Sequence, residues 1–445
     1  MDRQTASRDE LLASIATLEA AVAALQARVR ELEGRAGPGS PQGMPGHKPQ
    51  QRVEEPRRPR KRRAQGYGRR RSVPTEQVVH ALAQCPDCGC ALVGGTRQRR
   101  REVLELAPTP VAVVEQVYLA RQCPQCRRRC VPPAELDAVV VGRQRLGVGL
   151  ISLIATLRAV GRWPYRQIQW YLATVHGLRL SQGALVGAMR TVARQGAAQA
   201  RRIREQVRAS PVVHADETGW RENGRNGYVW TFSPPTARYF VHGSRAGSVV
   251  DAALGAAFAG VLVSDFYAAY DHVRTAKQRC WVHLLRDVQT LCQQHPDDAA
   301  LVAWATRLHA LFERGRAGAA GPTPGSRPAQ RQQQALRAEL QATLVELATV
   351  PTAEPPPVYQ TLARRLRRYE GELFTFVTEP GVSADNNAAE RSLRPRVTQR
   401  KISGGTRSAA GSETLMVLST LFGTWLAQHR DPLQACRELL THPRV

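Results

Sequence analysis

The sequence predicts a multidomain α/β protein, in which smaller N-terminal modules precede a mixed sheet with helices. Three observations predict this class. A heptad repeat of apolar residues opens the chain, two Cys-Pro-X-Cys pairs follow, and beyond residue 210 short apolar runs alternate with helical patterns. With 445 residues, 42% of them hydrophobic, the chain is long enough for several domains and a large core.

The charge of the chain predicts a polyanionic partner. Lys and Arg number 63 against 37 Asp and Glu, a formal net charge of +26. Such an excess is typical of nucleic-acid-binding proteins, although an Arg-rich proteome gives the same balance. The longest apolar stretch, Leu146–Leu157, is too short for a membrane span, and the N-terminus lacks the apolar segment of a signal peptide. We expect a cytoplasmic, nucleoid-associated protein that does not bind membranes.

Residues 1–34 are predicted to form a coiled-coil helix. Its apolar residues alternate in steps of four and three, with β-branched residues at a and Leu at d, which favours a parallel dimer. The alternative is an amphipathic helix packed on its own domain. The seam residues are Leu11, Ile15, Leu18, Val22, Leu25, Val29 and Leu32.

Residues 35–74 are predicted to be a disordered basic linker. Nine of the 15 residues from 57 to 71 are Lys or Arg, and Pro and Gly are interspersed. On DNA this run would neutralise phosphates, and the alternative is a solvated tail. The expected contacts include Arg57, Arg58, Arg60, Lys61, Arg62 and Arg63.

Residues 75–135 are predicted to be a zinc ribbon. Each Cys-Pro-X-Cys knuckle can present two thiolates, and together they complete the tetrahedral set of one structural Zn²⁺. The expected ligands are Cys85, Cys88, Cys123 and Cys126, with Cys90 and Cys130 as competitors. Strands are expected at Arg100–Leu106 and Val111–Ala120 between the knuckles.

Residues 136–209 are predicted to be a helical domain. Helices are expected at Leu146–Val160 and Tyr165–Val175, and a third helix is expected to be capped by Ser181. A helix-turn-helix DNA-binding domain and an ordinary helical linker domain fit this pattern equally well.

Residues 210–293 are predicted to form the first part of the main sheet. The expected order is three strands, helix, strand, helix, strand and helix, with the fifth strand at Arg279–Val282. In the ribonuclease H-like fold this order places the first and fourth strands side by side. Asp216 and Asp265, each after an apolar run, would then face each other at the end of the sheet.

Facing carboxylates suit two Mg²⁺ or Mn²⁺ ions, which stabilise the attacking and leaving oxygens of a phosphoryl displacement. The expected third acid is Glu390, on a short helix within residues 371–410 that Asp385 caps. Asn386, Glu390 and Arg394 are expected to share one helix face.

The residues around these acids carry a family resemblance. They are His214-Ala215-Asp216-Glu217-Thr218, Ser264–Tyr270, Cys280-Trp281-Val282-His283-Leu284, Asp385–Arg391, Arg400-Lys401 and Gly404-Gly405. With the N-terminal modules, they make the chain similar to the insertion-sequence-sixty-six family of bacterial DDE transposases over nearly its whole length. The resemblance implies DNA cleavage and strand transfer, with Asp216, Asp265 and Glu390 as metal ligands.

Other residues remain alternatives or auxiliaries. Asp271, Asp385 and Glu217 are rival acids: Asp271 is interpreted as a solvated helix residue, Asp385 as a cap, and Glu217 as pointing to the opposite face of the strand. His283 is predicted either to approach the scissile phosphate or to be structural. Trp220 is predicted either to stack on a base or to pack in the core.

The remaining segments complete the prediction. Residues 294–370 are interpreted as an α-helical insertion, and residues 411–445 as C-terminal helices. Phosphate contacts are expected from the basic cluster Arg391, Arg394, Arg396, Arg400 and Lys401, whose alternative is a solvated face.

The predicted function is that of a transposase acting on transposon ends and target DNA, as at least a dimer and with or without accessory proteins of the same element. A ribonuclease H-like nuclease or resolvase and a catalytically silent DNA-binding regulator are the alternatives.

Overall fold

The computed structural model describes residues 77–94, 111–133, 136, 138–142, 144–319, 321, 325–349 and 357–442. The chain divides into two units, Met1–Glu105 and Leu106–Val445, each described by itself. The expected coiled coil (1–34), the basic linker (35–74) and the strand at 100–106 lie outside the described residues, so these three remain predictions.

A five-stranded mixed sheet forms the centre of the second unit. Its strands are β3 (Val212–Glu222), β4 (Arg225–Ser233), β5 (Tyr239–Gly243), β6 (Val261–Ser264) and β7 (Lys277–Arg279), in the order β5-β4-β3-β6-β7. The first three are antiparallel neighbours, whereas β6 and β7 run parallel to β3. The expected pairing of the first and fourth strands is confirmed, with Val213 opposite Leu262.

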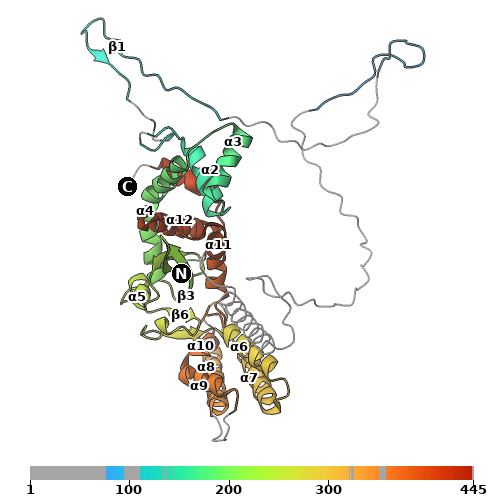
Figure 1. Ribbon diagram of the computed structural model, residues 1–445, viewed down its shortest axis with the longest axis vertical. Helices are drawn as coiled ribbons and strands as arrows, with labels where there is room; N and C mark the ends of the chain where they lie inside the picture. The colour runs from blue at the N-terminus through green and yellow to red at the C-terminus, as the bar shows by residue number, and fades with distance from the viewer. Residues whose placement is uncertain are drawn as a thin grey trace, which may run out of the picture. The chain divides into compact units, whose positions relative to one another are not determined.

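Helices on one face of the sheet share its larger hydrophobic core. They are α2 (Val148–Ala159), α3 (Tyr165–His176), α4 (Gln182–Arg208), α5 (Ser248–Leu254), α12 (Ala409–Ala427) and α13 (Pro432–Thr441) (Figure 1). Ser181 caps α4 as expected, because its Oγ accepts the amide of Ala184 at 3.1 Å. The core runs across the expected boundary at residue 209, since Ile203 and Val207 of α4 pack in the same cluster as Val213 of β3.

A second hydrophobic core lies against the other face. Val212 and Val263 belong to it, whereas Val213 and Leu262 belong to the first, because successive side chains of a strand point to opposite faces. Its helices are α6 (Trp281–Gln294), α7 (Ala299–Ala317), α8 (Arg327–Ala348), α9 (Gln360–Arg368) and α10 (Thr375–Thr378). Figure 1 shows α7, α8 and α9 gathered together, as expected for the helical insertion. The helix α11 (Asn387–Ser403) then leads to α12.

Three predicted elements are wrong in extent or place. The strand expected at Val111–Ala120 is absent from these described residues, whose valines are largely exposed, and a two-stranded ladder of β1 (Arg121–Gln122) and β2 (Arg129–Cys130) forms instead. The fifth strand ends at Arg279, because Trp281 is buried as the first residue of α6. Strand β3 continues through Asp216 to Glu222, since β4 pairs with it along that whole length.

None of the helices in the described part of the chain has both the length and the apolar character needed to cross a membrane.

Candidate active site

Two of the predicted acids lie at the same edge of the sheet. The parallel ladder between β3 and β6 ends with His214 opposite Val263. Asp216 follows two residues later, and Asp265 comes directly after the last residue of β6. The Oδ1 atom of Asp216 accepts the amide of Glu217 at 2.8 Å, and the Oδ1 atom of Asp265 accepts the amide of Tyr267 at 2.9 Å.

Burial and neighbouring carboxylates act on Asp216 together. Burial is the largest cause that raises its pKa to about 8, and the negative charges of Asp265, Glu217 and Glu390 add to it. Asp265 and Glu390 therefore both lie within electrostatic range of Asp216. A carboxylate held among like charges is stabilised by a cation, which brings the opposite charge.

Glu390 occupies the first turn of α11, as predicted. Its Oε1 atom lies 3.7 Å from the Nε2 atom of His283, on the first turn of α6. Glu390 Oε1 and His283 Nδ1 are both buried and have no hydrogen-bond partner.

Carboxylates whose charges act on Asp216, together with the unpartnered buried oxygen of Glu390, are of the chemical type that a divalent cation prefers, because such cations bind oxygen ligands. As they stand, no three His, Cys, Asp or Glu side chains of the described residues form a ready-made metal-binding group.

The rival acids have other partners. Asp271 pairs with Arg279 at 2.6 Å and Arg368 at 2.7 Å, so its interpretation as a solvated residue is wrong. Asp385 accepts the amide of Asn387, the first residue of α11, at 3.0 Å, but the N-cap position itself is Asn386, so Asp385 lies one residue before the cap that was expected of it.

Glu217 also has two partners of its own. It accepts hydrogen bonds from Tyr270 Oη at 2.8 Å and from Arg245 at 3.0 Å. Its side chain is only 3% exposed. These bonds occupy both of its carboxylate oxygens.

The structural roles of two buried residues were not predicted from the sequence. Asn386 was expected to share a helix face with Glu390 and Arg394, where it could help to position a phosphate, but it is fully buried and bonds to β3. Arg279 is also fully buried and donates to the carbonyl of Asp265 at 2.8 Å. No local sequence pattern indicates these roles. Arg279 ends a strand and Asn386 is the first of two asparagines, and the residues to which they bond lie elsewhere in the chain.

The other predicted contacts divide into exposed and internal residues. Trp220 is 2% exposed and donates to Thr406 Oγ1, so it packs in the core and does not present a stacking face. Arg391, Arg394 and Lys401 are exposed. Arg400 bonds instead to Thr218 and Gly219 of β3, and Arg396 is buried against the carbonyl of Ala159. Both therefore make hydrogen bonds within the fold.

Each cysteine knuckle forms a tight turn within its own unit. Gly89 donates its amide to the carbonyl of Cys85, and Arg127 donates likewise to Cys123, both at 2.9 Å. Hydrogen bonds from the amides of Cys88 and Asp87 lower the pKa of Cys85. Equivalent bonds from Cys126 and Gln125 lower the pKa of Cys123. Such turns favour the thiolate, the form that binds metal.

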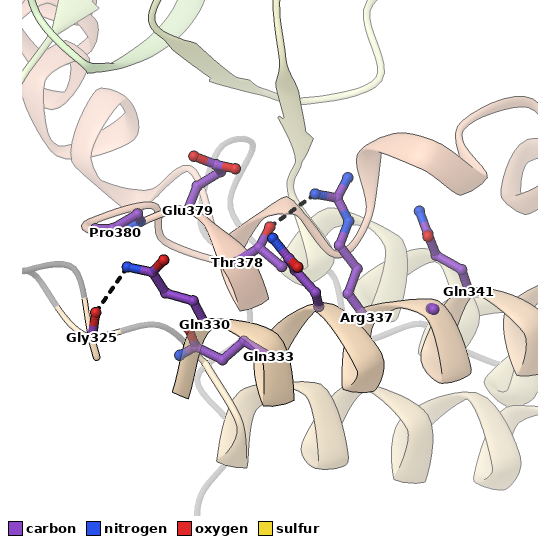
Figure 2. A pocket seen from close by; sticks show the side chains of 10 residues that line it. Gly325, Gln330, Gln333, Arg337, Gln341, Thr378, Glu379 and Pro380 are labelled. Carbon is purple, nitrogen blue, oxygen red and sulfur yellow. Dashed lines mark hydrogen bonds between the residues drawn. The ribbon is translucent and has the colours of Figure 1, made fainter. Parts of the chain in front are cut away.

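A polar hollow of about 450 Å³ lies in the helical insertion. Figure 2 shows Arg337 of α8 reaching Thr378, and Gln330 reaching the carbonyl of Gly325. None of the three predicted acids lines this hollow, so it is separate from the site at the edge of the sheet.

Comparison with known proteins assigns the family. The model of the family described as "Transposase IS66 family" matches residues 143–414, a range that contains Asp216, Asp265 and Glu390. The chain belongs to the IS66 family of transposases. The predicted resemblance is thereby confirmed. The match to the IS66 family model begins after both cysteine knuckles.

Two similar proteins come from Sinorhizobium fredii (strain NBRC 101917 / NGR234). The uncharacterized protein y4qI is 26% identical over 401 residues, which cover 82% of this chain and 72% of that protein. The uncharacterized protein y4hP is 24% identical over 390 residues, which cover 80% and 69%. These similarities extend well beyond the residues that the IS66 family model matches.

Proposed function

We propose that this chain is a DDE transposase that cleaves DNA at the ends of an insertion sequence and joins them to target DNA. Its sheet, with the strand order β5-β4-β3-β6-β7, is a ribonuclease H-like core. Asp216, Asp265 and Glu390 are the catalytic acids. Membership in a transposase family supports the reaction class, and the position of the acids supports the mechanism.

The observation that carries the proposal is the electrostatic environment of Asp216. A buried acid facing Asp265, Glu217 and Glu390 is a poor arrangement for stability by itself, because like charges repel. Glu217 pairs with Arg245 at 3.0 Å, whereas no Lys or Arg of the described residues forms an ion pair with Asp216, Asp265 or Glu390, and Glu390 has His283 at 3.7 Å. Such groups are typical of functional sites.

The protein contributes position and charge to the reaction. Asp216 and Asp265 present carboxylates at the edge of the sheet, and Glu390 presents a third from α11. Two Mg²⁺ or Mn²⁺ ions bound there would supply the Lewis acidity that an in-line phosphoryl displacement requires. His283, whose Nε2 atom lies 3.7 Å from Glu390, would be the group to donate a hydrogen bond to a non-bridging phosphate oxygen bound there.

The N-terminal modules are proposed to hold the DNA and the partner subunit. The helix of residues 1–34 would pair two chains, and the linker of residues 35–74 would bind phosphates without sequence preference. The knuckles of Cys85, Cys88, Cys123 and Cys126 would hold one Zn²⁺. The exposed face of α4, with Arg190 and Arg194, is the proposed recognition surface if α3 and α4 act as a helix-turn-helix. Such a protein would work in the cytoplasm, on the nucleoid.

The test is a joining assay with a labelled fragment that carries the end of the element, a target plasmid and Mg²⁺ or Mn²⁺. We expect the wild type to join the fragment and Asp265→Asn to fail at equal DNA occupancy. Nicking without joining would indicate a nuclease or resolvase. Binding without either reaction would indicate a silent regulator.

A further inference from the structure

A fully buried asparagine connects the strand of Asp216 to the helix of Glu390. The Nδ2 atom of Asn386 donates to the carbonyl of Ala215, the residue before Asp216, at 2.7 Å. Its Oδ1 atom lies 3.3 Å from Nδ1 of His214 on the same strand. Because Oδ1 is an acceptor, His214 must carry its proton on Nδ1. Both ends of the amide are therefore bonded to β3.

The backbone of the same residue supports the third acid. The carbonyl of Asn386 accepts the amide of Glu390 at 3.2 Å, which is the first helical hydrogen bond of this turn. The side chain of Asn386 thus bonds one residue away from Asp216, while its carbonyl bonds to Glu390 itself. A shift of this asparagine would change the spacing of the two carboxylates.

The connection extends to the second acid through Cys280. The backbone amide of Asn386 donates to the Sγ atom of Cys280 at 3.2 Å. The backbone amide of Cys280 donates in turn, at 2.9 Å, to the backbone carbonyl of Ser264, which is the residue before Asp265. Asn386 and Cys280 are both fully buried. The segments that carry all three acids therefore meet at Asn386, with Cys280 as the link to Asp265.

We propose that Asn386 is a positioning residue, which fixes the spacing of the Asp216, Asp265 and Glu390 carboxylates for a divalent cation. It does not touch the DNA, since it is buried. Its loss would leave the Ala215 carbonyl and the His214 Nδ1–H buried without partners, so α11 would no longer be held in one place. The proposal rests on the proposed function for the identity of the metal site.

The neighbouring Asn387 offers a matched control. It has the same side chain and lies one position further along, at the start of α11. It is half-buried, and within the described part of the chain its side chain makes no hydrogen bond. Asn387→Ser therefore reports the general cost of shortening an asparagine at this place in the fold.

The experiment is a calorimetric titration of the metal-free, full-length protein with Mn²⁺ alone. The variants are Asn386→Ser, Asn386→Ala and Asn387→Ser, with folding checked by circular dichroism at the same temperature. We expect the two Asn386 variants to bind Mn²⁺ about 10-fold to 100-fold more weakly, the range for residues that orient metal ligands, and Asn387→Ser to match the wild type. Joining by Asn386→Ser should recover at high Mn²⁺, whereas joining by Asp265→Asn should not.

Three results would overturn the proposal. The first is wild-type Mn²⁺ affinity in a folded Asn386→Ser protein. The second is loss of folding in both Asn386 variants where Asn387→Ser stays folded, which would make Asn386 a purely structural residue. The third is a wild-type protein that binds no Mn²⁺. This result would overturn the proposed function as well, and it is told apart from the other two because the wild type alone shows it.

Discussion

The Oε1 atom of Glu390 lies 3.7 Å from the Nε2 atom of His283, and this oxygen has no hydrogen-bond partner. The two residues belong to the first turns of α11 and α6, which are 107 positions apart along the chain at these residues. A buried, unpartnered oxygen is costly unless a ligand satisfies it. This unpartnered oxygen is consistent with the proposed role of Glu390 as a metal ligand, and the charge of Glu390 also raises the pKa of Asp216.

The first prediction concerns pH and stability without metal. The pKa of Asp216 is raised from 3.8 to about 8 by burial and by its acidic neighbours. Between these values the folded protein keeps a proton that the unfolded chain releases, so this group makes stability fall as the pH rises. Asp216→Asn stays neutral and should be more stable than the wild type at pH 9, on the order of 1–3 kcal/mol, but not at pH 4. Thermal unfolding in EDTA measures this, and an equal difference at both pH values would contradict it.

The second prediction separates DNA contacts from structural arginines. Arg394 is exposed, whereas Arg400 bonds to Thr218 and Gly219. Arg394→Ala should weaken DNA binding and reduce the slope of log affinity against log salt by about 1. Arg400→Ala should instead lower the free energy of unfolding by about 1 kcal/mol or more. Fluorescence anisotropy at several salt concentrations and thermal melting distinguish the two, and the same pattern in both variants would refute the assignment.

The third prediction concerns zinc. The purified protein should contain about one tightly bound Zn²⁺, since four thiolates leave no open position. Cys85→Ser and Cys123→Ser should each lose it, while Cys292→Ser, outside the knuckles, should keep it. Elemental analysis of the wild type and the three variants measures the content. A wild type purified without chelators that contains no zinc would exclude the ribbon.

The fourth prediction concerns self-association. The heptad seam of residues 8–34 requires a partner helix, because Leu and β-branched side chains are exposed along a lone helix. Deletion of these residues should lower the mass measured by light scattering without lowering the melting temperature. Replacement of Leu18 and Leu25 by Lys is a milder version, and replacement of Thr17 and Ala24 by Lys, both at the c position of the predicted heptad, is its control. An unchanged mass after deletion would show that the helix packs within its own chain or that another interface holds the oligomer.

The sequence predicted the strand pairing better than the ends of the strands. Apolar runs identified β3 and β6 correctly, since buried parallel strands are nearly continuous in hydrophobic residues. The length of β3 was missed because Thr218, Arg221 and Glu222 are polar and Gly219 disfavours a strand, so that the apolar run is interrupted, whereas pairing with β4 keeps this segment extended. The start of α6 was missed because Trp281 suits a strand by propensity, whereas packing against Phe312 and Phe374 places it on a helix.

The candidate acids could be chosen from the sequence, whereas the buried residues that bond to their segments could not. Asp216, Asp265 and Glu390 stand in motifs with a recognisable local pattern. Asn386 and Arg279 act through hydrogen bonds to residues 171 and 14 positions away, which no local pattern reveals. The basic cluster after Glu390 could not be divided from the sequence either. Arg396 is buried and Arg394 is exposed, and no local sequence pattern reveals this difference.

The most direct measurement is the joining rate of Glu390→Gln on a pre-cleaved element end, beside the wild type, at equal DNA occupancy and salt. This change removes a charge with little change in volume, and the matched control is Glu413→Gln on the exposed surface of α12. We expect Glu390→Gln to join at least about 100-fold more slowly, because a metal ligand is lost, with Glu413→Gln at the wild-type rate. Joining by Glu390→Gln at the wild-type rate would contradict the assignment of the third acid, and Asp385→Asn would then be the next variant to measure.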